Sequence, residues 1–525
     1  MADTDRPVEG PAGDLEGQGH HRDHGDAQGL RHGAMHLAED VGEARRRASE
    51  VMARIEWQTL PRIRHFHEFW YSKRSILVCV LAALVTFVLL WQQDATLRAT
   101  MTVFVFAACA WLLEPIPLYM TGLAVPMLLV LMGVFDPDEA FRPFSNSVIF
   151  LMIGGLVLAQ ALQKHGLDHR IAYATLLWSR GRIDRLVLLM MLVTAFLSMW
   201  MSNTAAVAVL LPVTFSVMAA LPPERENLKW KLLLGLTLSS ILGGMAMLTG
   251  TPPNLIAADA LAGYDTFDFA RWALIGLPVS MLSLLAIFYV LKRRYPSPDI
   301  TLDLEAVRKQ RDEAGPLSRD QRAVLAIFAI TILMWFFGAN VERMLDLPPS
   351  LSSAAIVSII SVVMLSVMGL LDMEDVHEVK WEIIFLLGGG LVLGEALLAS
   401  GAAERMGSFI ADAGSGMPVV AIVAIFVVLT VVLTNFISNT ATAAILVPIG
   451  LQTAEAMGIA PTAFVMAIGL SASIAFVTPV GTPSVALVYS TGKLPKRFLF
   501  TNGAIAAVIT AALVLVAVWL AFLAF

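Results

Sequence analysis

The feature that most constrains this sequence is a set of polar and glycine-rich motifs that occur twice inside otherwise apolar stretches. Three motifs recur in one order at nearly one spacing, between 231 and 236 positions: Phe150-Leu151 as Phe385-Leu386, Ser202-Asn203-Thr204 as Ser438-Asn439-Thr440, and Gly250-Thr251-Pro252 as Gly481-Thr482-Pro483. This agreement indicates two homologous halves. Because polar clusters are costly within a bilayer, their repetition at matching places is typical of a transporter built from repeats.

The composition is that of a polytopic membrane protein. Hydrophobic residues make up 57% and charged residues 15% of the 525 positions, a balance that does not fit a soluble enzyme. Both cysteines, Cys79 and Cys109, lie in apolar runs, so we expect neither a disulfide framework nor a zinc site. The sequence has no His/Cys/Asp constellation typical of an enzyme and no Gly-rich loop ending in Gly-Lys-Ser/Thr, so we expect neither an enzyme nor a nucleotide-driven pump, and no nucleic-acid partner.

The first 70 residues are polar and predict a disordered, juxtamembrane cytoplasmic tail. This tail contains His20, His21, His24, His32 and His36. We expect a solvated extension, with a metal-binding tail as the alternative. From residue 43 to residue 74 arginines alternate with aromatic residues, a pattern that fits a segment lying on an anionic inner leaflet.

Apolar segments of about the length that crosses a bilayer, ~20 residues, follow the tail. We predict eleven transmembrane helices, near residues 76–93, 99–114, 117–135, 146–163, 230–262, 272–291, 321–340, 351–371, 382–399, 461–490 and 499–523. The domain organisation predicted from them is a tail (1–70), a first transmembrane helix (75–95), repeat 1 (99–293), a cytoplasmic linker (294–320) and repeat 2 (321–525).

Two further apolar segments, 186–220 and 417–456, are each interrupted by Ser-Asn-Thr. If each enters and leaves the membrane on one side, a cytoplasmic N-terminus leaves only five of 36 basic residues outside, as the positive-inside rule requires. We therefore predict two re-entrant hairpins. Each repeat then has five spans and one hairpin. Because five crossings end on the opposite side of the membrane from where they began, the second repeat is inserted in the opposite orientation to the first. The fold class is an all-α polytopic membrane protein with an inverted repeat.

The hairpin tips carry the chemistry. Hydroxyl, amide and free carbonyl oxygens are hard neutral ligands suited to Na⁺, and helix N-termini favour an anion. No Lys, Arg or His lies near either tip. The charge of an anionic substrate would then be balanced by Na⁺, helix dipoles and neutral donors. Four carboxylates in or near apolar segments are alternative proton carriers: Glu114, Asp259, Glu382 and Glu395.

These motifs, together with Glu114-Pro115-Ile116-Pro117 and Trp381 followed by Phe385-Leu386-Leu387-Gly388-Gly389-Gly390, resemble those of the divalent anion:sodium symporter family over residues 75–525. Members of that family carry di- and tricarboxylates or sulfate. The resemblance implies an integral protein of a bacterial inner membrane and a homodimer. It also implies an elevator-like mechanism in which a mobile unit holds both hairpins.

Carried over by position, the resemblance implies two Na⁺ sites and one substrate site. The first Na⁺ site comprises Ser198, Ser202, Asn203 and Gly250, and the second comprises Thr434, Ser438, Asn439 and Gly481. The substrate would meet Asn203, Thr204, Thr251, Pro252, Asn439, Thr440, Thr482 and Pro483. Na⁺ is the coupling ion, and no other cofactor is expected.

One departure from the family pattern affects the second half. The first half reads Pro252-Pro253-Asn254, whereas the second reads Pro483-Ser484-Val485, where the family often repeats Pro-Pro-Asn. We expect Na⁺-coupled symport of a small dicarboxylate such as succinate, malate or fumarate. Alternatives on the same fold are a Na⁺-independent exchanger and a sulfate or tricarboxylate transporter, and an anion channel is the alternative of another class.

Overall fold

The computed structural model describes residues 62–222, 224–264, 268–297, 301, 304–346, 353–479 and 481–524. The predicted tail lies outside these residues up to residue 61. Contacts divide the chain into Met1–Tyr71 and Ser72–Phe525, and the account below concerns the second unit.

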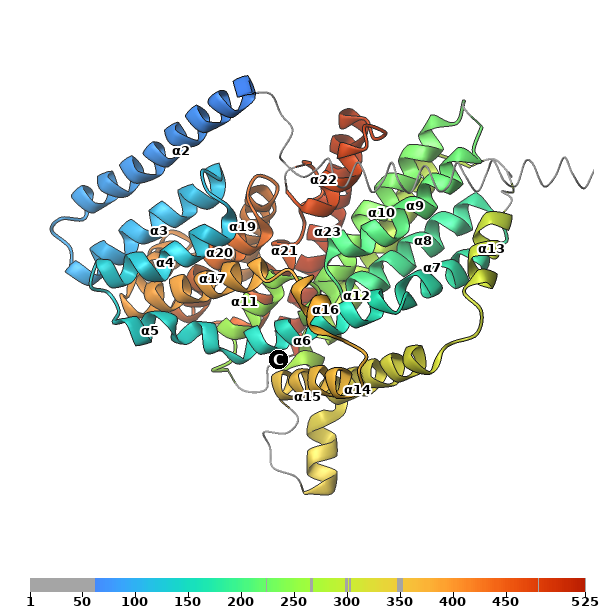
Figure 1. Ribbon diagram of the computed structural model, residues 1–525. Coiled ribbons are helices and arrows are strands. Elements are labelled where there is room, and N and C mark those ends of the chain that lie inside the picture. Colours follow the sequence, from blue (N-terminus) through green and yellow to red (C-terminus); the bar gives the residue numbers. More distant parts are fainter. Residues whose placement is uncertain are drawn as a thin grey trace, which may run out of the picture. The chain divides into compact units, whose positions relative to one another are not determined.

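The regular elements of the described residues are all helices, and these residues form no β-strand (Figure 1). The first half contains α2 (Arg62–Leu89), α3 (Ala95–Leu113), α4 (Leu118–Leu131), α5 (Pro137–Phe141), η1 (Arg142–Ser145), α6 (Ser147–Lys164), α7 (Leu167–Leu177), α8 (Ile183–Ser198), α9 (Asn203–Ala219), α10 (Glu226–Ala246), η2 (Leu248–Gly250), α11 (Pro252–Ala260) and α12 (Phe269–Arg294). After α13 (Glu305–Glu313), the second half contains α14 (Arg319–Leu345), α15 (Ala354–Val367), α16 (Met373–His377), α17 (Glu382–Ala399), α18 (Ala402–Ala413), α19 (Val419–Thr434), α20 (Asn439–Ala456), α21 (Pro461–Ser471), α22 (Pro483–Ser490) and α23 (Lys496–Ala524).

Each predicted span coincides with a helix or, at 230–262 and 461–490, with a helix pair separated by a break. Six of the described helices are long and apolar enough to cross a membrane by themselves: α3, α6, α12, α14, α17 and most of α23. This fold is that of an integral membrane protein, which confirms the predicted class.

Local sequence explains where the broken spans restart. Thr251 and Thr482 have extended backbones, and a proline follows each of them at the first position of a new helix. Proline has no backbone N–H and a φ already suited to a helix start, so it is well tolerated there, whereas in a helix interior it removes a hydrogen bond and crowds the preceding turn. The Gly-Thr-Pro motifs therefore break both spans, as predicted.

The two interrupted segments form helix pairs, as expected for hairpins. The arms α8 and α9 pack against each other, and so do α19 and α20. The first pair lies alongside α10 (Figure 1), and the second packs against α21. Because α8 and α19 each have 16 residues, each of these arms is about 24 Å long.

Helices of the first half pack against helices of the second half. The helix α4 packs against α17, and α6 packs against α15. A Cβ added at Gly389 would meet the backbone of Gly122, and a Cβ added at Gly154 would meet Ser358. Gly389 follows Gly154 by 235 positions and Ser358 follows Gly122 by 236, so these are equivalent pairs with the halves exchanged. Such reciprocal contacts are those of a two-fold axis, as an inverted repeat requires.

Each hairpin also packs against a broken span of the other half. The second arm of the first hairpin, α9, packs against α22 of the second half, and α20 packs against α11 of the first. The broken spans cross as well, because α10 contacts α22 and α11 contacts α21. Both motif-bearing tips therefore belong to one helical assembly.

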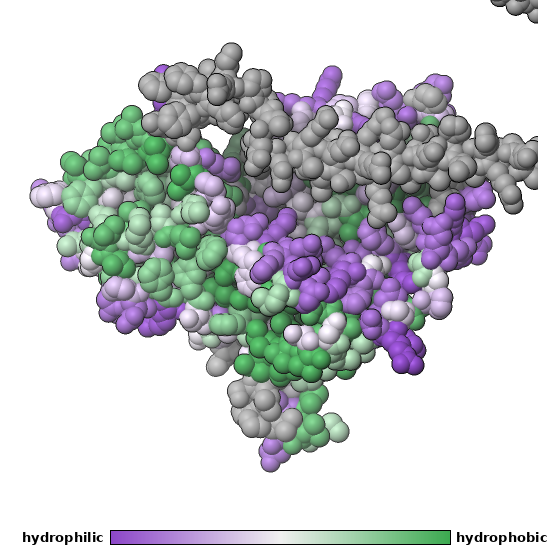
Figure 2. Space-filling model, viewed as in Figure 1, coloured by the Kyte–Doolittle hydropathy of each residue, from purple (hydrophilic) through white to green (hydrophobic). Residues whose placement is uncertain are grey.

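Hydrophobic side chains cover much of the outer surface. Figure 2 shows them gathered where α3 and α4 lie in Figure 1 and over the α14–α15 region. Leu131 is 74% exposed and Leu333 is 56% exposed. Apolar exposure on this scale is expected of a surface that faces lipid.

Candidate functional site

At the tip of the first hairpin, the last residue of α8 is bonded to the first residue of α9. The Ser198 hydroxyl donates a hydrogen bond to Asn203 Oδ1 at 2.8 Å. Ser202 is the N-cap of α9, and its Oγ accepts a 3.3 Å hydrogen bond from the Ala205 backbone N–H. Ser198 is fully buried, whereas Ser202, Asn203 and Thr204 are partly exposed. The structure thus brings together three of the four residues predicted for the first Na⁺ site.

Gly250, the fourth predicted residue, is connected to Asn203 through Gly244, which lies against both of them. A Cβ built on Gly244 would stand 2.3 Å from Asn203 Oδ1, and one built on Gly250 would stand 2.3 Å from the Gly244 carbonyl oxygen. Only glycine permits these approaches. Gly244 therefore joins the Asn203 side chain to the break at Gly250, a role that the sequence analysis missed.

The second tip has the same design. Thr434 Oγ1 lies 2.9 Å from Asn439 Oδ1 and also within hydrogen-bond distance of the Ala472 carbonyl of the broken span, and its single proton can be donated to either oxygen. A Cβ built on Gly481 would lie 3.3 Å from the Thr434 carbonyl oxygen. Ser438 is the N-cap of α20 but makes no side-chain cap hydrogen bond. Thr434, Asn439 and Gly481 therefore lie together, with Ser438 beside them in the chain.

The predicted substrate residues lie at the starts of four helices. Asn203-Thr204 begin α9 and Asn439-Thr440 begin α20, while Thr251 and Thr482 precede α11 and α22. These helices pack in pairs across the halves, α9 on α22 and α20 on α11. Helix N-termini carry a partial positive charge and unpaired N–H groups, so this arrangement suits an anion.

The oxygen atoms at each tip fit a small hard cation. Asn203 Oδ1 accepts a hydrogen bond from Ser198, Asn439 Oδ1 lies within reach of one from Thr434, and each keeps a free lone pair. The donor set at each tip consists of hydroxyl, amide and backbone oxygens, with neither a lysine nor an arginine anywhere in residues 186–220 or 417–456. Neutral oxygens of this kind suit alkali and alkaline-earth cations.

Each tip is also tied to a break by residues to which the sequence analysis gave no role in the site. Thr249 Oγ1 donates to the Met199 carbonyl at 3.2 Å, and Thr478 Oγ1 donates to the Asn435 carbonyl. Asn254 and Asn435 bond the unwound backbone itself. An asparagine within an apolar run is a sequence signal for such a role, and Asn435 stands next to a predicted ligand.

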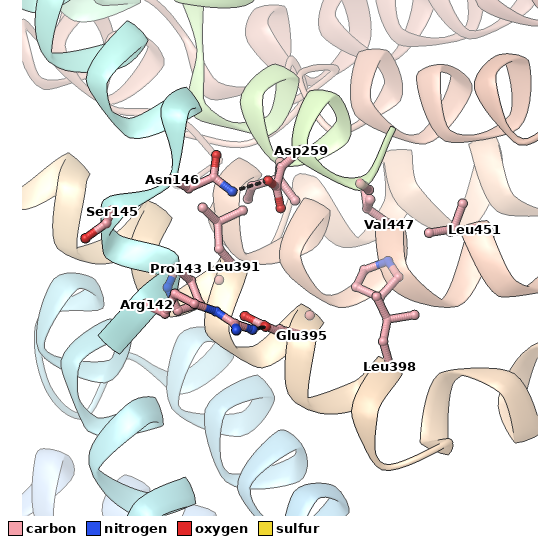
Figure 3. A pocket seen from close by; sticks show the side chains of 15 residues that line it. Arg142, Pro143, Ser145, Asn146, Asp259, Leu391, Glu395, Leu398, Val447 and Leu451 are labelled. Atoms are coloured by element: carbon pink, nitrogen blue, oxygen red, sulfur yellow. Dashed lines mark hydrogen bonds and ion pairs between the residues drawn. The ribbon is translucent and has the colours of Figure 1, made fainter. Parts of the chain in front are cut away.

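A cavity of about 430 Å³ lies away from the tips, between η1, α11, α17 and α20. In Figure 3 Asn146 points toward Asp259, to which its Nδ2 donates, and Arg142 points toward Glu395, with which it forms an ion pair. Two of the four alternative proton carriers, Asp259 and Glu395, are therefore engaged by polar partners. No predicted Na⁺ or substrate residue lines this cavity.

The known proteins to which this chain is similar are transporters. The chain matches a family described as citrate transporter over residues 108–469 and 353–525. It is 34% identical to an uncharacterized transporter of Methanocaldococcus jannaschii, over 78% of this chain and 91% of the relative. It is 27% identical to the sodium-dependent dicarboxylate transporter SdcS of Staphylococcus saprophyticus, over 77% of this chain and 82% of the relative.

Two solved structures share the fold. The YdaH transporter of Alcanivorax borkumensis superposes with a TM-score of 0.53 at 16% identity, covering 81% of this chain and 98% of that one. MtrF of Neisseria gonorrhoeae superposes with a TM-score of 0.51 at 12% identity, covering 74% and 84%. At these identities the likeness concerns the fold alone.

Proposed function

Because this chain belongs to the divalent anion:sodium symporter family, we propose that it is a secondary transporter that moves a small dicarboxylate across the membrane together with Na⁺. It is an integral membrane transporter and not an enzyme. The observation that carries the proposal is the equivalent pair of hydroxyl–amide contacts, Ser198 with Asn203 and Thr434 with Asn439.

Na⁺ binds at each tip through the asparagine Oδ1, the neighbouring hydroxyl groups and a backbone carbonyl of the break. The first site uses Ser198, Ser202, Asn203 and Gly250, and the second uses Thr434, Ser438, Asn439 and Gly481. The hydroxyl–amide hydrogen bonds hold these oxygens in place before the ion arrives, which reduces the entropy lost on binding. The sodium-dependent relative supports this assignment.

The substrate is a small dicarboxylate of the succinate, malate or fumarate type. Thr204 stands on the tip of one half and Thr440 on the tip of the other, so each half offers one hydroxyl to one carboxylate. Thr251-Pro252 and Thr482-Pro483 complete the site at the two breaks. Bound Na⁺ and the helix N-termini balance the charge of the anion, since neither hairpin contains a basic residue.

The transport cycle is of the elevator type. The mobile unit of this cycle comprises both hairpins and both broken spans, which pack together through the contacts of α9 with α22 and of α20 with α11. The helices α4, α6, α15 and α17, which pack in exchanged pairs, form the scaffold of a homodimer. The protein lies in a bacterial inner membrane with its N-terminus in the cytoplasm.

Citrate is the leading alternative substrate, because the matching family is described as citrate transporter. A third carboxylate would need a further donor, and Val485 in the second half supplies no polar side chain. A Na⁺-independent exchanger would have no need for the paired oxygen clusters at the tips. Two hydroxyls that stand on different halves suit an anion with two separated carboxylates better than sulfate, which is compact.

The deciding experiment is uptake of labelled succinate into proteoliposomes, with and without an inward Na⁺ gradient. We expect succinate to accumulate above its equilibrium concentration only when the inward Na⁺ gradient is present. Uptake that is unchanged when K⁺ or choline replaces Na⁺ would favour the exchanger instead. Flux that never exceeds electrochemical equilibrium under any gradient would favour a channel.

A further inference from the structure

In the first half, an asparagine located after the break bonds the backbone before it. Asn254 of α11 is fully buried, and its Nδ2 donates to the Gly244 carbonyl at 3.0 Å and to the Met247 carbonyl at 2.7 Å. Both carbonyls lie at the end of α10, where the helix no longer supplies donors. A buried carbonyl without a donor costs free energy in a membrane protein, so Asn254 stabilises the unwound backbone.

The second half has no asparagine at the equivalent position. Asn254 stands four residues after Gly250, whereas the residue four places after Gly481 is Val485, which is fully buried and cannot donate. The second break is also longer, since α21 ends at Ser471 and α22 begins at Pro483. Its unwound backbone therefore needs hydrogen-bond partners from elsewhere.

Asn435 provides these partners from the hairpin tip. It is 5% exposed, and its Nδ2 donates to the Ile474 carbonyl at 3.0 Å while its Oδ1 accepts from the Val477 N–H at 2.8 Å. Its own carbonyl accepts from the Thr478 hydroxyl. One residue thus bonds the unwound segment at three places.

The equivalent position of the first tip carries no such group. Asn435 corresponds, at the offset of 236, to Met199, which is buried but has no amide. The two halves have therefore exchanged the position of a single asparagine: the first half has Asn254 with Met199, and the second has Asn435 with Val485. Each half keeps one side-chain amide on its unwound backbone.

Asn435 is connected to the proposed second cation site on both sides. It follows Thr434 directly, and the Thr434 hydroxyl lies within hydrogen-bond distance of both Asn439 Oδ1 and the Ala472 carbonyl. On the other side, Thr478 Oγ1 accepts a 3.2 Å hydrogen bond from the Gly481 N–H. A displacement of the unwound segment would therefore move the Gly481 carbonyl relative to the tip.

We propose that Asn435 is a positioning residue for the cation site of the second half, where it does from the hairpin tip what Asn254 does from the broken span in the first half. Asn435 is not itself an ion ligand in this assignment. It holds the segment from Ile474 to Thr478 against the tip, so that the oxygens of Thr434, Asn439 and Gly481 keep their spacing. The inference rests on the proposed Na⁺ coupling.

The test uses the purified full-length protein and measures the Na⁺ concentration that gives half-maximal thermal stabilisation, with K⁺ at equal ionic strength as the reference. The variants are Asn435→Met, Val485→Asn and the double variant, which moves the asparagine to its first-half position. Asn435→Met removes both side-chain hydrogen bonds to the unwound segment, and we expect it to raise the half-saturating Na⁺ concentration about tenfold or more, since one lost buried hydrogen bond already corresponds to roughly that factor. The double variant should recover most of the Na⁺ affinity that Asn435→Met loses. Val485→Asn alone should keep the half-saturating Na⁺ concentration within about twofold of wild type, a change smaller than the free energy of one ordinary hydrogen bond.

A matched control removes a buried asparagine elsewhere. Asn502 of α23 is 4% exposed and bonds the Phe498 carbonyl at 2.8 Å and the Tyr295 hydroxyl. Asn502→Leu should lower the melting temperature and leave the half-saturating Na⁺ concentration unchanged. If Asn435→Met does not fold, the neutral and smaller Asn435→Ser, which lacks the amide for Ile474 and Val477, takes its place, and the same increase is expected.

The possible results separate the inference from the proposed function. A wild-type protein that Na⁺ does not stabilise would reject the proposed coupling and this inference with it. A wild-type response that Asn435→Met retains in full would reject only the positioning role. A double variant no better than Asn435→Met would overturn the equivalence of Asn435 and Asn254.

Discussion

The Ser198 hydroxyl donates a 2.8 Å hydrogen bond to Asn203 Oδ1, and this contact joins the end of one helix to the start of the next. The equivalent contact at the other tip, from Thr434 to Asn439, measures 2.9 Å. Both pairs are five residues apart, and they occupy positions 236 residues apart in the chain. Two halves that invert their direction thus keep one local geometry at the tips.

Replacing Asn203 or Asn439 by alanine removes the amide oxygen from a tip. An unmade polar contact in a buried shell costs about 1–3 kcal/mol, so we expect each variant to lose roughly tenfold or more in Na⁺ affinity. The measurement is the Na⁺ dependence of succinate uptake. Ser216→Ala is the control and should behave as wild type, because Ser216 lies on the same helix as Asn203 and its hydroxyl donates to the Pro212 carbonyl. Unchanged Na⁺ dependence in both alanine variants would exclude these residues as ligands.

Thr204→Val and Thr440→Val remove the hydroxyl groups proposed to meet the two carboxylates. Because a site built around hydrogen bonds discriminates against unpaired groups, each should weaken dicarboxylate uptake while sparing Na⁺ binding. Thr214→Val is the matched control, since Thr214 lies on the same helix as Thr204 and bonds the Leu210 carbonyl. Competition against labelled succinate tests the substrate: citrate or sulfate inhibiting better than malate and fumarate would contradict the assignment.

Lys231 carries a buried charge that joins three helical segments. Its side chain is fully buried, and Nζ lies 2.8 Å from Asp184 Oδ1 and 3.2 Å from both the Tyr295 carbonyl and Ser297 Oγ. Lys231→Met leaves Asp184 without its closest cation, and removing one partner of such a pair costs about 3 kcal/mol. We expect a clearly lower melting temperature.

Lys292→Met is the control for that effect. Lys292 Nζ lies 3.8 Å from Asp184 Oδ2, and its side chain is 52% exposed, so its loss should cost less than about 1 kcal/mol. Equal destabilisation by the two variants would show that the burial of Lys231 does not matter.

Gly389→Ala tests the exchanged packing of the two halves. A Cβ at Gly389 would lie 2.2 Å from the Gly122 carbonyl oxygen, so α4 and α17 would have to separate. Overpacking of this kind costs about 1–3 kcal/mol. Gly263→Ala, where an added Cβ meets nothing within 4 Å, should leave the melting temperature unchanged. A Gly389 variant as stable as the Gly263 variant would argue against the close approach.

The membrane orientation is testable with reporter fusions. A cytoplasmic N-terminus and an external C-terminus place 31 of 36 basic residues inside. A reporter that is active only outside the cytoplasm should therefore be active when it is fused after Phe525. A cytoplasmic reporter signal there would contradict both the orientation and the odd number of crossings in each repeat.

The helices, the hairpins and the breaks were predictable from sequence because their causes are local. A proline after the extended Thr251 or Thr482 favours a helix start at that residue, and a Ser-Asn-Thr cluster interrupts an apolar run in any apolar surroundings. The repetition of these motifs was itself evidence for two halves. For the same reason, the pairing of Ser198 with Asn203 and of Thr434 with Asn439 follows from the motifs themselves, because each pair spans a single tip.

Contacts between distant segments could not be predicted in this way. Val485 looked like the loss of a polar group from the second half, and only the folded chain places Asn435, 50 residues earlier, on the same unwound backbone. Gly244 against Asn203, and Gly389 against Gly122, likewise depend on which helices pack together. A local pattern constrains dihedral angles and helix ends, whereas these hydrogen bonds and close approaches exist only when packing brings together atoms that are far apart in the chain.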